Sequence, residues 1–376
     1  MSKAVKKLQV VSDLESAMIR LVRARGGISR AELARKLKLV PSTAGIYVDR
    51  LLAEGYLVET AVSVRGVGRP PVVVELNPRV GRFVGVDFDA RQIFATAVDF
   101  AHQPLQEARR TIPARASVER VLEIIADAIT EVAGTNEHEL LGIGLGVPGP
   151  VDAARGISLR YAFLRDWHEV PIGPRVAEHF LVPVSVENNL RSIALAELWS
   201  GQGRGLRNFV CLGVRSGIGS GIIVEGQLLK GANNLAGEIG RWVCPESVND
   251  SSGQDAQTIE DVASLTALLK ELELPTVADL LIALERRQRP VVAAVQRAAR
   301  FHGWVVHQLA TLFDPERLIV AGPLVEQELY WAALQSAAAD FGGAELAAGL
   351  APSMLGPYAG ATGAAALAFQ HWKPQR

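Results

Sequence analysis

The first part of the chain carries apolar residues at the three-to-four spacing of a helix face. The segment DLESAMIRLVRAR, beginning at Asp13, has this spacing and is followed by Gly26 and Gly27, which are typical of a helix end. A second helix, RAELARKLKL, is predicted to begin after Ser29, because a serine followed three residues later by Glu32 is typical of a capping box. Two short helices are therefore expected before residue 40.

A third helix is predicted in TAGIYVDRLLAEGYL, opened by Ser42 after a turn that contains Val40 and Pro41. Its inward face is expected to hold Ile46, Val48, Leu51 and Leu52, while Thr43, Tyr47 and Arg50 lie on other faces. Two strand-like segments follow, YLVETAVSV and PPVVVEL, joined by RGVGRP. Three helices and a β-hairpin are the layout of a winged helix-turn-helix, whose third helix enters the major groove of DNA.

The charge distribution agrees with a DNA-binding head. Through Arg82 there are 15 Lys and Arg against 7 Asp and Glu, a balance of +8, whereas the rest of the chain has a balance of −9. Basic side chains gain affinity for DNA by releasing counterions from its phosphates. The residues predicted to contact DNA are Ser42, Thr43, Tyr47, Arg50 and Arg69. Arg69 lies in GRPP, a narrow turn suited to an A·T-rich minor groove. A protein-docking module with the same layout is the alternative.

After Asn77 and Pro78 the pattern changes to alternating strands and helices. One α/β group comprises FVGVDFD, IFATAVDF, SVERVLEIIADAITEVAG and LLGIGLGVPG. A second comprises VPVSVENN, FVCLGVRSGIGSGIIVEG, several long helices and RLIVAGPL. We expect a head at residues 1–78 and a body at 79–376, with two α/β lobes whose glycine-rich strand ends meet at a ligand-binding cleft.

Composition narrows the class of protein without naming it. The 376 residues are 49% apolar, contain no apolar run long enough to cross a bilayer and begin without an apolar leader segment, so a cytoplasmic location is expected. The cysteines are Cys211 and Cys244. Two cysteines cannot form a disulfide framework or a four-cysteine metal site, and reduced, partly buried thiols are expected.

Several motifs follow one another in an order that is more specific than any one of them. They are GVPGPVD (146–152), VENN (186–189), GIGSGIIVEGQLLKG (217–231), GEIG (237–240) and IEDVAS (259–264). In this order they resemble the signatures of the ROK family of repressors and sugar kinases, and the head followed by GRPP and LNP resembles its repressor branch. The resemblance implies an actin-like, ribonuclease-H-like two-lobed α/β body with a hexose site in the cleft.

Two requirements of a sugar kinase are missing. The family's kinases carry Asp-x-Gly-Gly-Thr at the first phosphate loop, whereas this chain has Asp87 followed by Phe, Asp89, Ala and Arg91. Arg215 and Ser216 replace a Gly-Thr in the second loop. The position of the kinases' general base holds Asn189, whose amide cannot take a proton from a sugar hydroxyl. Binding without turnover, and without ATP, is therefore expected.

The zinc site of the family is also expected to be lost. An ungapped alignment from GEIG to IED puts its four ligand positions at Arg241, Ser251, Gly253 and Thr258, which do not form a plausible zinc ligand set.

The effector-binding residues that the resemblance implies are Asn188, Asn189, Glu238, Arg241 and Glu260. Arg241 stands where the family has a histidine. It either binds an anionic group of the ligand, such as that of a sugar phosphate or sugar acid, or replaces the charge of zinc and pairs with Glu238 or Glu260. Trp167 either lines the cleft or packs inside the lobe.

The sequence thus predicts a sugar-responsive transcriptional regulator, in particular a repressor. The resemblance and operator symmetry imply a homodimer or a dimer of dimers on a palindromic, A·T-rich operator, with closure of the cleft on the ligand changing the spacing of the heads. The alternatives are a regulator that binds no ligand and responds to a protein partner, and a residual sugar kinase with an appended head.

Overall fold

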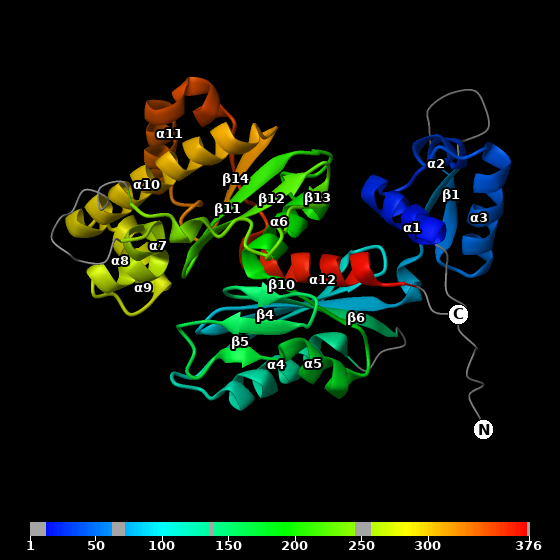
Figure 1. Cartoon of the computed structure of the whole chain (residues 1–376), viewed down its shortest axis with the longest axis horizontal. Helices are drawn as coiled ribbons and strands as arrows, with labels where there is room; N and C mark the ends of the chain where they lie inside the picture. Colours follow the sequence, from blue (N-terminus) through cyan, green and yellow to red (C-terminus); the bar gives the residue numbers. More distant parts are fainter. Residues whose placement is uncertain (1–12, 62–71, 135–138, 245–256, 374–376) are drawn as a thin grey trace.

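The computed structural model describes residues 13–61, 72–134, 139–244 and 257–373. The head consists of α1 (Asp13–Arg25), α2 (Arg30–Lys36), α3 (Pro41–Ala53) and the antiparallel strands β1 (Leu57–Ala61) and β2 (Val72–Leu76). Ser29 caps α2 by accepting a hydrogen bond from the Glu32 amide. The predicted order of three helices and a hairpin is confirmed (Figure 1).

The third helix differs from its prediction in two respects. It begins at Pro41, because a proline at the first helical position loses no hydrogen bond, and Val40 is its N-terminal flanking residue. Ala44, Val48 and Leu51 form its buried face. The prediction that Ile46 packs inward was wrong: Ile46 lies two residues from Val48, on nearly the opposite side of the helix, and is 62% exposed.

The first lobe of the body contains a mixed sheet in the order β10-β6-β3-β4-β5. Its strands are β3 (Arg82–Phe88), β4 (Gln92–Asp99), β5 (Pro104–Thr111), β6 (Leu140–Val147) and β10 (Val184–Asn188). The short 3-10 turn η1 (Pro78–Val80) precedes β3, and a small sheet of β7 (Val151–Asp152), β8 (Ile157–Arg160) and β9 (His168–Val170) follows β6. Helices α4 (Val118–Ala133) and α5 (Ile172–Phe180) lie on the side of the sheet away from the second lobe (Figure 1).

The second lobe repeats the arrangement with the sheet order β13-β12-β11-β14-β15. These strands are β11 (Phe209–Val214), β12 (Ile218–Val224), β13 (Gln227–Leu228), β14 (Arg317–Ala321) and β15 (Leu350–Pro352). Its helical elements are η2 (Ile239–Arg241), α7 (Ile259–Ala263), α8 (Leu265–Glu271), α9 (Val277–Glu285), α10 (Arg289–Phe313) and α11 (Glu328–Ala348). The expected two α/β lobes are therefore present.

Two helices pack together between the sheets, α6 (Asn189–Ser200) and α12 (Ala359–His371), the latter preceded by η4 (Gly356–Tyr358). Their approach is close enough to require glycine. A Cβ atom at Gly363 of α12 would lie 1.6 Å from the Ser192 carbonyl oxygen of α6, and one at Gly144 of β6 would lie 1.7 Å from the Ala364 carbonyl oxygen. Backbone thus packs directly on backbone along α12.

The head is joined to the body by a continuous apolar core. Met18 and Ile19 of α1 belong to the same buried cluster as Phe83 and Phe369 of the body. Nearby, the Arg23 guanidinium of α1 lies 4.4 Å from the ring centroid of Trp199, at the end of α6. Desolvation, reinforced by Arg204, lowers the pKa of Arg23 to about 10, which remains well above neutral pH. No helix in the described part of the chain combines the length and apolarity needed to cross a membrane.

A buried histidine in the second lobe makes stability depend on pH. His302 of α10 lies 3.0 Å from the Ala263 carbonyl oxygen through Nε2 and 3.0 Å from the Tyr330 hydroxyl through Nδ1. A carbonyl can only accept, so Nε2 carries the proton and Nδ1 accepts from Tyr330 in the neutral ring. Burial lowers the pKa of His302 to about 4.

Unfolding releases this histidine to its ordinary pKa near 6.5, so the unfolded chain binds the extra proton first as the pH falls. The contribution of His302 is present above pH 6.5 and is lost toward pH 4, by about 3 kcal/mol in the free energy of unfolding. Urea unfolding between pH 7 and 4 should show a shallower loss for His302→Gln than for the exposed control His179→Gln. Equal slopes would show that His302 does not contribute this dependence.

Candidate functional site

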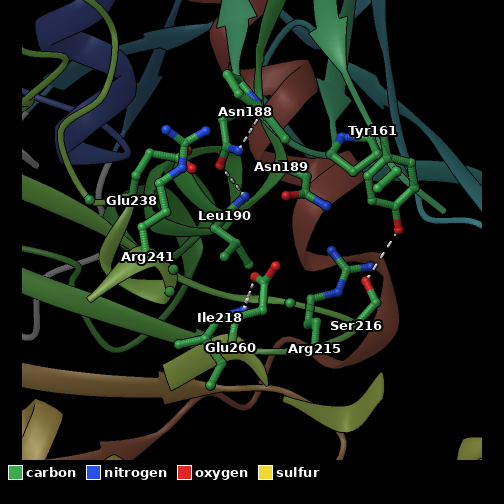
Figure 2. A pocket seen from close by; sticks show the side chains of 18 of the residues that line it. Tyr161, Asn188, Asn189, Leu190, Arg215, Ser216, Ile218, Glu238, Arg241 and Glu260 are labelled. Atoms are coloured by element: carbon green, nitrogen blue, oxygen red, sulfur yellow. Dashed lines mark hydrogen bonds between the residues drawn. The ribbon is translucent and has the colours of Figure 1, made fainter. Parts of the chain in front are cut away.

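A cavity of about 210 Å³ lies between the two lobes. Its walls come from the loop after β6, the segment after β8, the start of α6, the β11–β12 turn, and the segment around η2 with the start of α7 (Figure 2). The lining residues are 148–150, 160–163, 188–190, 215–220, 237–238, 240–241 and 260. All five residues predicted to bind an effector, Asn188, Asn189, Glu238, Arg241 and Glu260, are among them. The fold therefore brings together side chains separated by more than seventy residues.

Asn188 and Asn189 mark the junction of β10 and α6. The Asn188 side-chain oxygen accepts hydrogen bonds from the amides of Leu190 and Arg191, capping α6, and its side-chain nitrogen donates to the Gly149 carbonyl oxygen at 3.0 Å. Asn188 thus has a structural role as well as a place in the cavity wall. Asn189 is largely buried and interacts through its side chain with Asp87.

The floor of the cleft contains a buried ion pair between the lobes. The Arg215 guanidinium, at the β11–β12 turn, lies 2.7 Å from Oδ2 of Asp87, at the end of β3. Asp87 is fully buried and the Arg215 side chain is 16% exposed. Burial raises the pKa of Asp87 to about 6, against the opposing effect of Arg215. The Arg215 guanidinium therefore places a positive charge at the loop where the sequence departs from the kinase pattern.

Two further contacts join the lobes around this pair. The hydroxyls of Tyr161 and Ser216 lie 3.4 Å apart at one side of the cavity (Figure 2). Arg91, one of the residues that interrupt the first phosphate loop, donates to the Pro275 carbonyl oxygen. The lobes therefore meet through side chains at the positions that depart from the kinase motifs.

Two carboxylates, Glu238 beside η2 and Glu260 of α7, also line the cavity. Oε2 of Glu260 accepts a hydrogen bond from the Ile218 amide at 3.0 Å, which fixes one of its oxygens. Burial raises the pKa of Glu260 and of Glu238, while the nearby Arg241 acts in the opposite direction on both. Both side chains are half-buried, so they reach the cavity as hydrogen-bond acceptors.

Arg241 lies at the exposed rim of the cavity. Within the described ranges of the chain, no carboxylate oxygen comes within 4.0 Å of its guanidinium, so the expected alternative of an ion pair with Glu238 or Glu260 is not formed. Its donors are available to a ligand.

A charged network behind the cavity was not predicted from the sequence. Arg191 on the first turn of α6 pairs with Glu187 of β10 at 3.0 Å, and both side chains are at most 1% exposed. Lys230 lies 3.3 Å from the other oxygen of Glu187, and Arg191 donates to the Asn234 carbonyl oxygen at 3.0 Å. This network anchors the segment that leads to Glu238. The only sequence signal is the spacing of four residues between Glu187 and Arg191, which spans a strand end.

The residues predicted to contact DNA do not share one environment. Ser42 is exposed and Thr43 half-buried, both in the first turn of α3. Tyr47 packs against the core of the head, and Arg50 lies over its ring and pairs with the buried Glu15 at 3.1 Å. Arg69 lies outside the described residues. Tyr47 and Arg50 are therefore engaged in contacts within the head.

The remaining predictions concern metals, cysteines and Trp167. Ser251 and Gly253, two of the aligned zinc positions, lie outside the described ranges, and within those ranges no group of three His, Cys, Asp or Glu could hold a metal ion. Cys211 and Cys244 are both buried. Trp167 packs inside the first lobe, where its indole donates to the Ser158 hydroxyl at 2.8 Å.

Comparison with known proteins gives two family matches. A model of the ROK family matches residues 83–371, and a model of winged helix-turn-helix DNA-binding domains matches residues 12–58. A xylose repressor of Caldicellulosiruptor bescii is 29% identical over 314 residues, covering 78% of each chain. A glucokinase of Streptomyces coelicolor is 30% identical over 271 residues, covering 66% of this chain and 84% of its own.

The fold is also found among solved structures. The crystal structure of a ROK family transcriptional regulator, described as a homolog of the E. coli MLC protein, superposes with a TM-score of 0.75 at 21% identity. The match covers 95% of this chain and 94% of that one, so the shared fold extends over both the head and the body.

Proposed function

The chain belongs to the ROK family, and from that premise we propose that it is a sugar-responsive transcriptional repressor whose cleft binds a carbohydrate without phosphorylating it. One observation carries this proposal: a winged head shares an apolar core with a body that has a sugar-kinase-like cleft. In that cleft the side chain of Arg215 occupies the phosphate-loop region. The similarity to xylose repressors supports the same function.

The chemistry of the cleft supports binding without catalysis. Phosphoryl transfer needs room and dipoles for the transferred phosphate and a group that takes the proton of the attacking hydroxyl. Arg215 and Asp87 neutralise each other's charge at the floor of the cleft, and the side-chain amide of Asn189 lies beside them. An amide holds a sugar hydroxyl by hydrogen bonding but does not deprotonate it.

Restoring the general base alone should not restore a kinase. We expect neither the native protein nor Asn189→Asp to release ADP above background from Mg-ATP with glucose or xylose, because the Arg215 side chain still occupies the phosphate-loop region. A coupled ADP-release assay measures this, with the Streptomyces coelicolor glucokinase as positive control. Sugar-dependent turnover by the native protein would overturn the non-catalytic assignment.

The ligand is proposed to be held by the carboxylates of Glu238 and Glu260 and the amides of Asn188 and Asn189, which suit sugar hydroxyls. Arg241 pairs with no carboxylate in the described part of the chain, which favours a ligand that also carries an anionic group. A homodimer or a dimer of dimers on a palindromic, A·T-rich operator follows from the repressor assignment, as does a cytoplasmic location, where the DNA is.

The decisive experiment is fluorescence anisotropy of the full chain on the DNA upstream of its own gene, at fixed salt, with xylose, glucose, sugar phosphates and sugar acids. We expect one compound to shift the DNA-binding midpoint at least tenfold, about 1.4 kcal/mol of coupling. Arg241→Ala should weaken the response to an anionic effector, whereas the exposed control Arg286→Ala should leave it unchanged. Specific DNA binding that no compound moves would favour the regulator that responds to a protein partner.

A further inference from the structure

The outward face of α3 carries one large apolar side chain, Ile46, that the described part of the head leaves exposed. Ser42, Ile46 and Asp49 follow one another at helical spacing and are all exposed. The Asp49 carboxylate is paired with Arg30 of α2, which also binds Glu59 of β1. Ile46 is 62% exposed, although burying an isoleucine is among the more favourable contributions to folding. The exposed side chain of Ile46 is therefore accessible to contact with another molecule.

The neighbouring residue makes this position accessible to a large surface. Gly45 precedes Ile46, and a Cβ atom built on Gly45 would meet nothing within 4 Å. The helix backbone is thus open beside Ile46, so a partner surface can approach α3 closely there. Tyr47 and Arg50, the larger candidates for DNA contact, are engaged with the core and with Glu15.

The chemistry of the partner follows from where α3 sits. It is the third helix of a winged helix-turn-helix, the helix that enters the major groove, and the chain through Arg82 has a charge balance of +8. The major groove presents one apolar group, the C5 methyl of thymine, and apolar side chains discriminate thymine by contact with it. The neighbours of Ile46 on this face are small or already form an ion pair. An exposed isoleucine side chain makes a favourable apolar contact with this methyl group, which it cannot make with a phosphate or with a hydrogen-bond donor of a base edge.

We propose that Ile46 is a specificity-determining residue that reads a thymine methyl group in the major groove of the operator. The inference rests on the proposed function, because it requires DNA binding. It predicts that part of the affinity for the operator depends on the thymine methyl. This part of the affinity should require Ile46 and no other exposed apolar side chain of α3.

The test can be made before the operator sequence is identified. The DNA upstream of the protein's own gene is amplified once with dTTP and once with dUTP, which removes the C5 methyl of thymine and leaves its pairing edge intact. We expect the native protein to bind the thymine DNA more tightly than the uracil DNA, by roughly fourfold for each methyl contacted. Ile46→Ala should bind both DNAs with the same affinity, close to that of the native protein for uracil DNA.

Two controls distinguish this role of Ile46 from a general loss of DNA binding by the head. Ile282→Ala removes an isoleucine that is 45% exposed on α9 of the body, and it should keep the native preference for thymine DNA. The dependence of the dissociation constant on salt should be unchanged in Ile46→Ala, because no phosphate contact is removed.

The outcomes of the two proposals differ. If the native protein binds neither DNA at low salt, the proposed repressor function fails, and this inference with it. If the native protein binds both DNAs equally, or if Ile46→Ala keeps the native thymine preference, DNA binding stands and the role of Ile46 is refuted.

Discussion

Replacing Gly363 by alanine is expected to destabilise the body by about 4 kcal/mol or more, enough to leave little folded protein. The added Cβ would lie 1.6 Å from the Ser192 carbonyl oxygen, 2.5 Å from its carbonyl carbon and 3.1 Å from the Ala196 amide nitrogen. These are backbone atoms of α6, so no side-chain rotation relieves the clash. α12 would have to move away from α6, and Gly144, on which Ala364 rests, would lose its contact.

The matched control is Gly349→Ala. Gly349 ends α11 with φ of −77°, an ordinary value for alanine, and a Cβ there would come no closer than 3.5 Å to another atom. Thermal unfolding and the soluble yield of both variants measure the difference. A Gly363→Ala protein as stable as Gly349→Ala would mean that α12 does not pack on α6 in this way.

Removing Arg191 is the second change with a large expected effect. Arg191→Ala would leave the fully buried Glu187 with Lys230 as its remaining cation, and breaking a buried pair from one side costs about 3–5 kcal/mol in the free energy of unfolding. It would also remove the hydrogen bond to the Asn234 carbonyl oxygen. Urea unfolding at constant pH provides the measurement.

The control for this change is Arg300→Ala. Arg300 pairs with Asp340 at 3.2 Å, but both side chains are more than half exposed, so its loss should cost no more than about 1 kcal/mol. A double variant, Glu187→Leu with Arg191→Met, should recover part of the stability lost in Arg191→Ala, because it removes the buried charge as well as its partner. Equal effects of Arg191→Ala and Arg300→Ala would contradict the buried position of the network.

Much of the fold could be predicted because the elements that carry it have strong periodic patterns. The helices of the head and the strands β3, β4, β6 and β11 stand where apolar spacing predicted them. Strand β5 was not predicted, because its sequence PLQEARRT is largely exposed at the edge of the sheet and lacks a run of apolar residues. Ile46 was misplaced because several helix faces can be drawn through a segment as apolar as α3, and only packing decides among them.

The sequence predicted which residues line the site, but not which contacts they make with one another. Motif order assigned the five effector-binding residues, which line one cavity, although their contacts with an effector stay predictions. The pair of Arg215 with Asp87 could not be predicted, since the two residues are 128 positions apart and belong to different lobes. Whether Arg241 forms an ion pair with Glu238 or Glu260 likewise depends on distances of a few ångströms, which residue spacing does not contain.

The helices α6 and α12 give this architecture a mechanical property. Both begin at the cleft, beside Asn188 and Asp87, and both end at the head, where Trp199 meets Arg23 and Phe369 meets the apolar side of α1. Each is about 20 Å long at the usual rise per residue, so a tilt of roughly 5° at the cleft would displace its far end by nearly 2 Å. Because their backbones are in contact at Gly363, a displacement of one helix at the cleft would move the other with it toward the head.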